Sequence, residues 1–133
     1  MEKKAVINKD YMELWYHPDS KIVHHKMKQT LPKGGHKELL STGAEYMEKY
    51  RAVKWLSDDR DMVVVREEDY KWANENWTPR VLKAGFKYWA IVLPKSAIGT
   101  MQMKGFVKQY KDLGVEVEVF ETLESAMKWL ESK

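Results

Sequence analysis

A run of charged residues, Asp58 to Asp61, directly follows an apolar segment, Val53 to Ser57, that the sequence predicts as a short strand. The carboxylates of Asp58 and Asp59 could act as a general base or bind Mg²⁺, and the guanidinium of Arg60 could bind an anion. Ligands of open α/β sheets bind at the carboxyl ends of strands, so this loop is a candidate site. The alternative is a solvated loop with local ion pairing, because charged loop ends are common and no second carboxylate cluster completes a metal site.

Lys95 lies at another predicted junction between a strand and a helix, in the segment Pro94 to Ser96. The carboxyl ends of parallel strands meet at one edge of a sheet. Lys95 therefore joins the loop residues 58–60 as a candidate for binding a ligand or a partner.

The histidines do not predict a metal site. His24 and His25 are neighbours on a predicted strand and point to opposite faces, so they cannot bind one ion there. His17 and His24 share a face only diagonally across a predicted hairpin, about 7 to 8 Å apart, and no third ligand is evident. His25 falls on the apolar face, where we expect a hydrogen-bonded histidine of the core or its rim.

Signatures of catalysis are absent from the sequence. The chain has no cysteine, which excludes thiolate nucleophiles, thiolate zinc sites and disulfides. The motifs of nucleophile elbows, zinc proteases, dinucleotide-binding turns and phosphate-binding loops are also missing. We therefore expect no catalytic residue, no metal and no cofactor.

The tryptophans are more informative, since the chain has six of them. Trp15 lies on the polar face of the predicted hairpin, and Trp72 lies off the buried stripe of its predicted helix. Exposed tryptophans tend to mark contact surfaces, so we predict that Trp15 and Trp72 line a partner interface or an apolar ligand pocket. The alternative is partial burial under loops or long side chains.

A basic stripe on one predicted helix does not indicate a nucleic-acid partner. Lys104, Lys108 and Lys111 share a helix face, but no aromatic residues for stacking are interleaved with them. The net charge of +3 is also too small to name such a partner. We expect a solvated helix face and no binding of nucleic acid.

A β-hairpin is predicted over residues 11–28, because two β-rich runs flank a cluster of turn formers, Pro18 to Lys21. Centring the turn on that cluster places Trp15 opposite His24. The same register pairs Glu13 with Lys26, Leu14 with His25 and Met12 with Met27. The face expected in the core carries Met12, Leu14, Tyr16, Val23 and Met27.

Helical and extended patterns alternate after the hairpin. Ser96 and Thr122 are expected to cap helices, and Pro79 is expected to kink or split the helix that contains it. This order predicts an α/β fold with a mixed sheet, in which an N-terminal antiparallel hairpin is followed by parallel βα units and about four helices. Helices are expected over residues 36–51, 67–85, 97–113 and 122–130, strands over 53–57, 88–93 and 115–119, and a brief extended return over 62–65.

Length and composition favour one domain that spans residues 1–133. The chain is 44% hydrophobic, which is enough for a core, and it is close to the usual size of a domain. The longest apolar run, Tyr88 to Leu93, is far below the roughly 20 residues that span a bilayer, and the N-terminus lacks the apolar region of a signal peptide. A soluble cytoplasmic protein without a membrane span is expected.

Several strings resemble the bacterial SpoIIAA-like branch of the STAS-type domains, small α/β proteins grouped with CRAL-TRIO lipid-binding folds. The resemblance covers nearly the whole chain, and it is carried mostly by core positions and strand ends. It implies a fold rather than an activity. The strings are KWLSDDR (54–60), WANENWTPR (72–80), AIVLPK (90–95) and VFETLESAMKWL (119–130).

The resemblance does not extend to the phosphorylation motif of the better-known relatives. Anti-anti-sigma factors bind a partner kinase and are phosphorylated on a serine in an Asp-Ser-x-Gly motif at a helix start. The corresponding junction here, Val65 to Asp69, has no serine or threonine, and its acids would repel a phosphate. Ser57 lies nearby, but it ends a strand and is outside that motif.

The leading hypothesis is a non-enzymatic binding or regulatory domain that acts through a protein partner, a homodimer or a small ligand. The candidate binding residues are Trp15, Asp58, Asp59, Arg60, Trp72 and Lys95. A carrier of an apolar or amphipathic, lipid-like molecule is the alternative, and it requires an enclosed apolar pocket. A small hydrolase that uses Asp58 or Asp59 is the third hypothesis.

Overall fold

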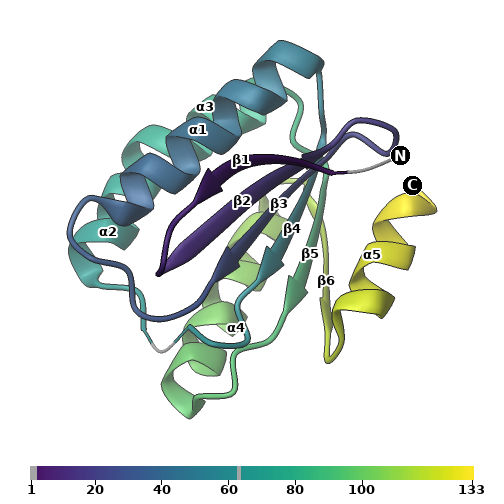
Figure 1. Ribbon diagram of the computed structural model, residues 1–133. Helices are drawn as coiled ribbons and strands as arrows, with labels where there is room; N and C mark the ends of the chain where they lie inside the picture. The colour runs from purple at the N-terminus through teal and green to yellow at the C-terminus, as the bar shows by residue number, and fades with distance from the viewer. Residues whose placement is uncertain (1–2, 63) are drawn as a thin grey trace.

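A mixed sheet organises the computed structural model, which describes residues 3–62 and 64–133. In the described chain the sheet has six strands in the order β1-β2-β3-β4-β5-β6 (Figure 1). The strands are β1 (Lys4–Asn8), β2 (Met12–His17), β3 (Ile22–Met27), β4 (Lys54–Asp58), β5 (Tyr88–Val92) and β6 (Glu116–Phe120).

The hairpin of β2 and β3 has the register that the turn formers predict. Trp15 pairs with His24, and the other three predicted pairs are also present. The predicted core residues of the hairpin are all buried against the helices. Lys4–Asn8 forms a strand of its own, β1, which pairs antiparallel with β2.

The strands from β3 to β6 run parallel, as helical connections between strands require. The central position of β5 explains its continuous apolar sequence, because both of its faces are covered. β6 lies at the edge of the sheet, and its alternation of valine and glutamate fits that place.

Helices cover the two faces of the sheet unequally (Figure 1). One face packs against α1 (Gly35–Tyr50), α4 (Ala97–Asp112) and the helical segment between β4 and β5. Within residues 3–62 and 64–133, α5 (Leu123–Glu131) is the helix that covers the other face. The predicted caps are present, since Ser96 accepts a hydrogen bond from the Gly99 N–H and Thr122 accepts one from the Ser125 N–H.

The helical segment between β4 and β5 is divided as predicted, but the irregularity precedes Pro79. It consists of α2 (Glu67–Trp72), a π-helical turn η1 (Ala73–Trp77) and α3 (Thr78–Lys83). The Thr78 N–H donates to the Ala73 carbonyl, five residues back, and Pro79 lies in the first turn of α3. Pro79 has no N–H to bond the preceding turn and its ring crowds that turn, which accounts for the wider π geometry there.

The predicted extended return over residues 62–65 does not form a strand in its described part. Met62, Val64 and Val65 lie in irregular structure, and residue 63 is outside the described residues. No helix in residues 3–62 and 64–133 has the length and apolar character needed to cross a membrane.

Candidate functional site

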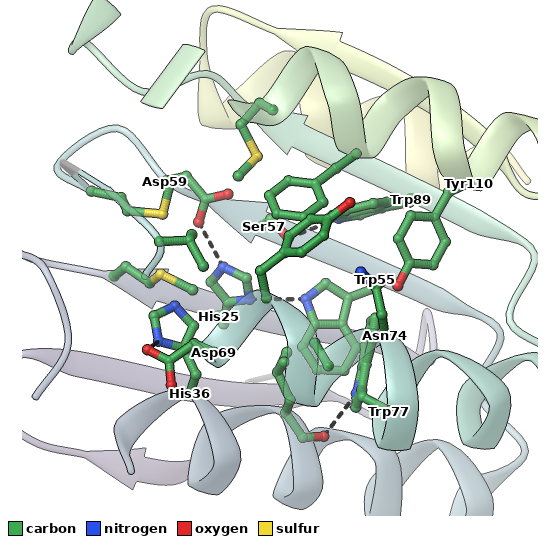
Figure 2. Close-up of a pocket in the computed structure, with 18 residues that line it drawn as sticks. His25, His36, Trp55, Ser57, Asp59, Asp69, Asn74, Trp77, Trp89 and Tyr110 are labelled. Carbon is green, nitrogen blue, oxygen red and sulfur yellow. Dashed lines mark hydrogen bonds and ion pairs between the residues drawn. The ribbon is translucent and has the colours of Figure 1, made fainter. Parts of the chain in front are cut away.

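A pocket of about 80 Å³ lies between β3, β4 and β5 and the helices α1, α2, η1 and α4. Its walls are mainly hydrocarbon, and its histidine and aspartate side chains lie toward one side (Figure 2). The aromatic side chains that line it are Trp55, Tyr70, Trp77, Trp89, Phe106 and Tyr110.

The three tryptophans of the pocket use their indole N–H groups within the protein. Trp55 Nε1 donates to His25 Nδ1 at 2.9 Å, Trp77 Nε1 to the Leu40 carbonyl at 2.9 Å, and Trp89 Nε1 to Ser57 Oγ at 2.8 Å. Their rings are therefore held in place, and the polar edge of each indole already has a partner. What these residues offer to a ligand is apolar ring surface.

His25 is the centre of a buried hydrogen-bonded chain. Its Nδ1 accepts from Trp55, so in the neutral ring the proton is on Nε2, which donates to Asp59 Oδ1 at 2.7 Å. The side chains of His25 and Asp59 are 4% and 3% exposed. Both ring nitrogens of His25 are therefore occupied, and neither is free to take a proton from a substrate.

His36 and Asp69 form a second buried pair at the pocket. His36 Nδ1 lies 3.2 Å from Asp69 Oδ2, and the side chains are 5% and 7% exposed. Both nitrogens of His36 and Oδ2 of Asp69 are without a hydrogen-bond partner among the described residues. Burial lowers the pKa of His36, although Asp69 acts in the opposite direction. These atoms are the polar groups of the pocket left to bind a ligand.

The π turn shapes the more exposed side of the pocket. Ala73, Asn74 and Trp77 of this turn line it, which fits the frequent occurrence of π turns at functional sites. Asn74 accepts a hydrogen bond from Gln109 Nε2 of α4 at 2.6 Å. The rings of Tyr70 in α2 and Phe106 in α4 also pack together, with 5.0 Å between their centroids.

Only one of the predicted site residues, Asp59, lines this pocket. Asp58 and Asp59 are 1% and 2% exposed, so the prediction of a solvated loop is wrong for both. Asp58 accepts two hydrogen bonds from Arg60, at 2.8 Å each, at the end of β4. Burial would raise the pKa of Asp58, but the hydrogen bonds and charge of Arg60 outweigh it and lower that pKa.

The other predicted site residues lie outside the pocket. The ring of Trp15 packs against that of His24 on the sheet face opposite the pocket, with 4.7 Å between the ring centroids and an interplanar angle of 49°. Trp72 packs at the rim of the core on the pocket side. Trp15 and Trp72 therefore do not share one surface. Lys95 is 78% exposed and lies 3.6 Å from Asp61.

The predicted role of His25 is confirmed, whereas His36 and Asp69 were missed. The hairpin register places His25 on the core face, opposite Leu14. Helical spacing was a usable signal for the other two, because His36 precedes Leu39 and Leu40 by three and four positions and Asp69 precedes Ala73 by four. His17 Nε2 and His24 Nδ1 lie 3.1 Å apart, a hydrogen-bond distance.

Comparison with solved structures finds a crystal structure of an uncharacterized protein of the DUF3478 family, with a SpoIIAA-like fold, from Shewanella loihica PV-4. The similarity covers 97% of this chain and 92% of that protein, with a TM-score of 0.54 and 14% sequence identity. No protein-family model and no curated protein matches the chain. At this identity the comparison shows the fold alone, and the chain has a SpoIIAA-like fold.

Proposed function

We propose that this protein is a non-enzymatic binding domain that takes a small molecule into the pocket between the sheet and helices α1, α2, η1 and α4. One observation carries the proposal. The pocket has aromatic walls whose tryptophan rings are fixed by hydrogen bonds, and it also contains buried polar atoms on His36 and Asp69. These atoms lack hydrogen-bond partners in the described residues. Buried polar groups are normally hydrogen-bonded, so a ligand that supplies the partners would complete the site.

The contacts of Asp58 and Asp59, the residues predicted for a hydrolase, argue against that role. Asp59 and His25 bond each other, and the second nitrogen of His25 is held by Trp55. A general base needs an acceptor free to reach the proton it removes. Asp58, the other candidate for a hydrolase, directs both of its oxygens to Arg60.

The size of the pocket favours a compact ligand over a lipid chain. Sites that enclose drug-sized ligands measure about 300 to 1,000 Å³. This pocket measures about 80 Å³. A rigid apolar cavity of about 150 Å³ takes benzene, so by proportion this one takes about three or four non-hydrogen atoms.

The methyl groups of methionine provide a direct test. Met27, Met62 and Met103 line the pocket, whereas Met101 is 74% exposed on α4. Titration with isopropanol, acetone, acetamide and trimethylammonium, each of four non-hydrogen atoms, should shift the pocket signals with at least one compound, as followed by NMR of methionine methyl groups. The Met101 signal should stay in place.

A pocket-filling variant supplies the control. Ala73 is half-buried at the pocket, so Ala73→Trp should fill it and abolish the shifts. Ala97→Trp adds the same side chain at an exposed position of α4 and should leave them unchanged. Pocket signals that do not move with any of the four compounds, or that move equally in Ala73→Trp, would contradict the proposal.

A further inference from the structure

The ionisable side chains that line the pocket include two carboxyl groups and two histidines, His25 and His36. Asp59 and Asp69 both line it, and the described lining includes no lysine or arginine. Asp59 has one oxygen bonded to His25, whereas Oδ2 of Asp69 has no hydrogen-bond partner in the part of the chain described. Its nearest polar neighbour is His36 Nδ1 at 3.2 Å, which makes no hydrogen bond with it. A buried carboxylate oxygen without a hydrogen bond favours a ligand that brings a donor and a positive charge.

The groups around Asp69 offset its charge only in part. His25 donates to Asp59 rather than to Asp69. Burial lowers the pKa of His36 and so favours its neutral form. Arg66 Nη1 is 3.9 Å from Asp69 Oδ2, but the Arg66 side chain is 40% exposed and the same nitrogen donates to the Leu31 carbonyl. The charge of Asp69 is therefore offset by one partly solvated guanidinium and by a histidine whose neutral form is favoured by burial.

The aromatic walls suit a cation for a separate reason. The face of an aromatic ring is electronegative and attracts cations, most strongly for tryptophan. The rings of Trp55, Trp77 and Trp89 are held through their N–H groups, and Trp89 packs edge-on against Tyr110 at 4.9 Å. A ligand in the pocket meets ring surface on several sides and carboxylate on another (Figure 2).

We propose that the pocket binds the head group of a small organic ammonium ion, with an N–H directed to Asp69 Oδ2 and its methyl groups against the tryptophan rings. This inference rests on the proposed function and adds the chemical class of the ligand. The pocket of about 80 Å³ accommodates a head group of about three or four non-hydrogen atoms. Any longer substituent extends toward Tyr70 and Asn74, which retain solvent exposure.

A matched pair of probes tests the charge. Trimethylammonium and isopropanol each have four non-hydrogen atoms and one hydrogen-bond donor, but only the first is charged. The two are titrated into the full-length protein at pH 7.5, with methionine-methyl NMR as the readout. Trimethylammonium should bind at least 10-fold more tightly than isopropanol. Its dissociation constant should be no lower than about 40 µM, the limit for a ligand of four non-hydrogen atoms.

Substitution of the carboxylate locates the effect. Asp69→Asn keeps the shape of the side chain. It should weaken the binding of trimethylammonium at least 10-fold and leave the binding of isopropanol nearly unchanged. Asp61→Asn is the matched control, because Asp61 lies in the loop after β4, outside the pocket lining, with its side chain 44% exposed. It should alter neither affinity.

Each outcome separates this inference from the proposed function. If isopropanol binds as well as trimethylammonium, the ligand class is wrong and the binding pocket stands. If neither shifts the pocket methyl groups, the inference fails, and the proposed function fails with it when acetone and acetamide are also inactive. The comparison of the two probes on the unsubstituted protein decides the question even if Asp69→Asn does not fold.

Discussion

His24 shows how burial changes the chemistry of a single side chain. It lies on the sheet face opposite the pocket, 2% exposed, with its ring stacked on His17 at 5.3 Å. Burial lowers the pKa of His24 to about 3, and electrostatic interactions with His17, His25 and Lys3 act in the same direction. His24 therefore stays neutral in the folded protein at pH values where a solvated histidine is charged.

The folded protein should lose stability in acid because of His24. Below pH 6.5 the unfolded chain takes up a proton that the folded chain does not take up until about pH 3, so the contribution is complete above pH 6.5 and is lost as the pH falls. One such proton lowers the free energy of unfolding by about 1.4 kcal/mol per pH unit. We measure the free energy of unfolding by urea at several pH values between 6 and 4. Its dependence on pH should be weaker by about that amount in His24→Leu than in the unsubstituted protein. An unchanged slope would show that His24 does not carry this proton linkage.

At the scale of elements, the packing of α1 on β4 positions the pocket. Gly43 of α1 lies against the ring of Trp55, and a Cβ at this position would overlap the ring atoms Cη2 and Cζ3. The close approach lets α1 cover the sheet while Trp55 reaches His25. A glycine is required here by space rather than by backbone conformation.

Two glycine substitutions should therefore have opposite effects. Gly43→Ala forces Trp55 out of place and should cost about 1 to 3 kcal/mol of unfolding free energy. Gly105→Ala, in the middle of α4, meets no atom within 4 Å and should stabilise the protein by about 0.5 to 1 kcal/mol. Urea denaturation of both variants measures the difference. A Gly43→Ala variant as stable as Gly105→Ala would refute this account of the packing.

At the scale of the whole molecule, the sheet separates two cores. The pocket belongs to the larger core, which α1, α4 and the divided helix cover. The smaller core lies under α5 and includes Leu56, Ala90 and Leu130, all fully buried. The second core can support the fold without contact with a ligand.

Truncation of the smaller core should thus lower stability without changing binding. Leu130→Ala removes a fully buried side chain on the face opposite the pocket and should cost about 2 to 5 kcal/mol. The folded variant should still bind the probes that bind the unsubstituted protein. Its affinity for them should differ from that of the unsubstituted protein by no more than about twofold. Calorimetric unfolding and NMR titration measure the two quantities, and a large loss of affinity with an intact fold would show that the two cores are coupled.

Local patterns in the sequence predict most of the fold. The turn formers before β3 determine the register that pairs Trp15 with His24, and Ser96 and Thr122 act as the expected helix caps. The order of helices and strands predicts a mixed sheet with a parallel half. These features depend on neighbouring residues and on periodicity, which a sequence displays directly.

The sequence by itself determined the face on which His25 lies, but tertiary packing decided what surrounds it. Asp59 is 34 positions away in the chain, yet its carboxylate reaches His25 because β3 and β4 are parallel neighbours. The sequence suggests a solvated loop at Asp58 and Asp59, because a run of charged residues does not reveal their hydrogen bonds to Arg60 and His25. His36 and Asp69 meet only when α1 and α2 pack on the same face. Burial and long-range pairing arise from the packing of whole elements, and a local pattern does not contain them.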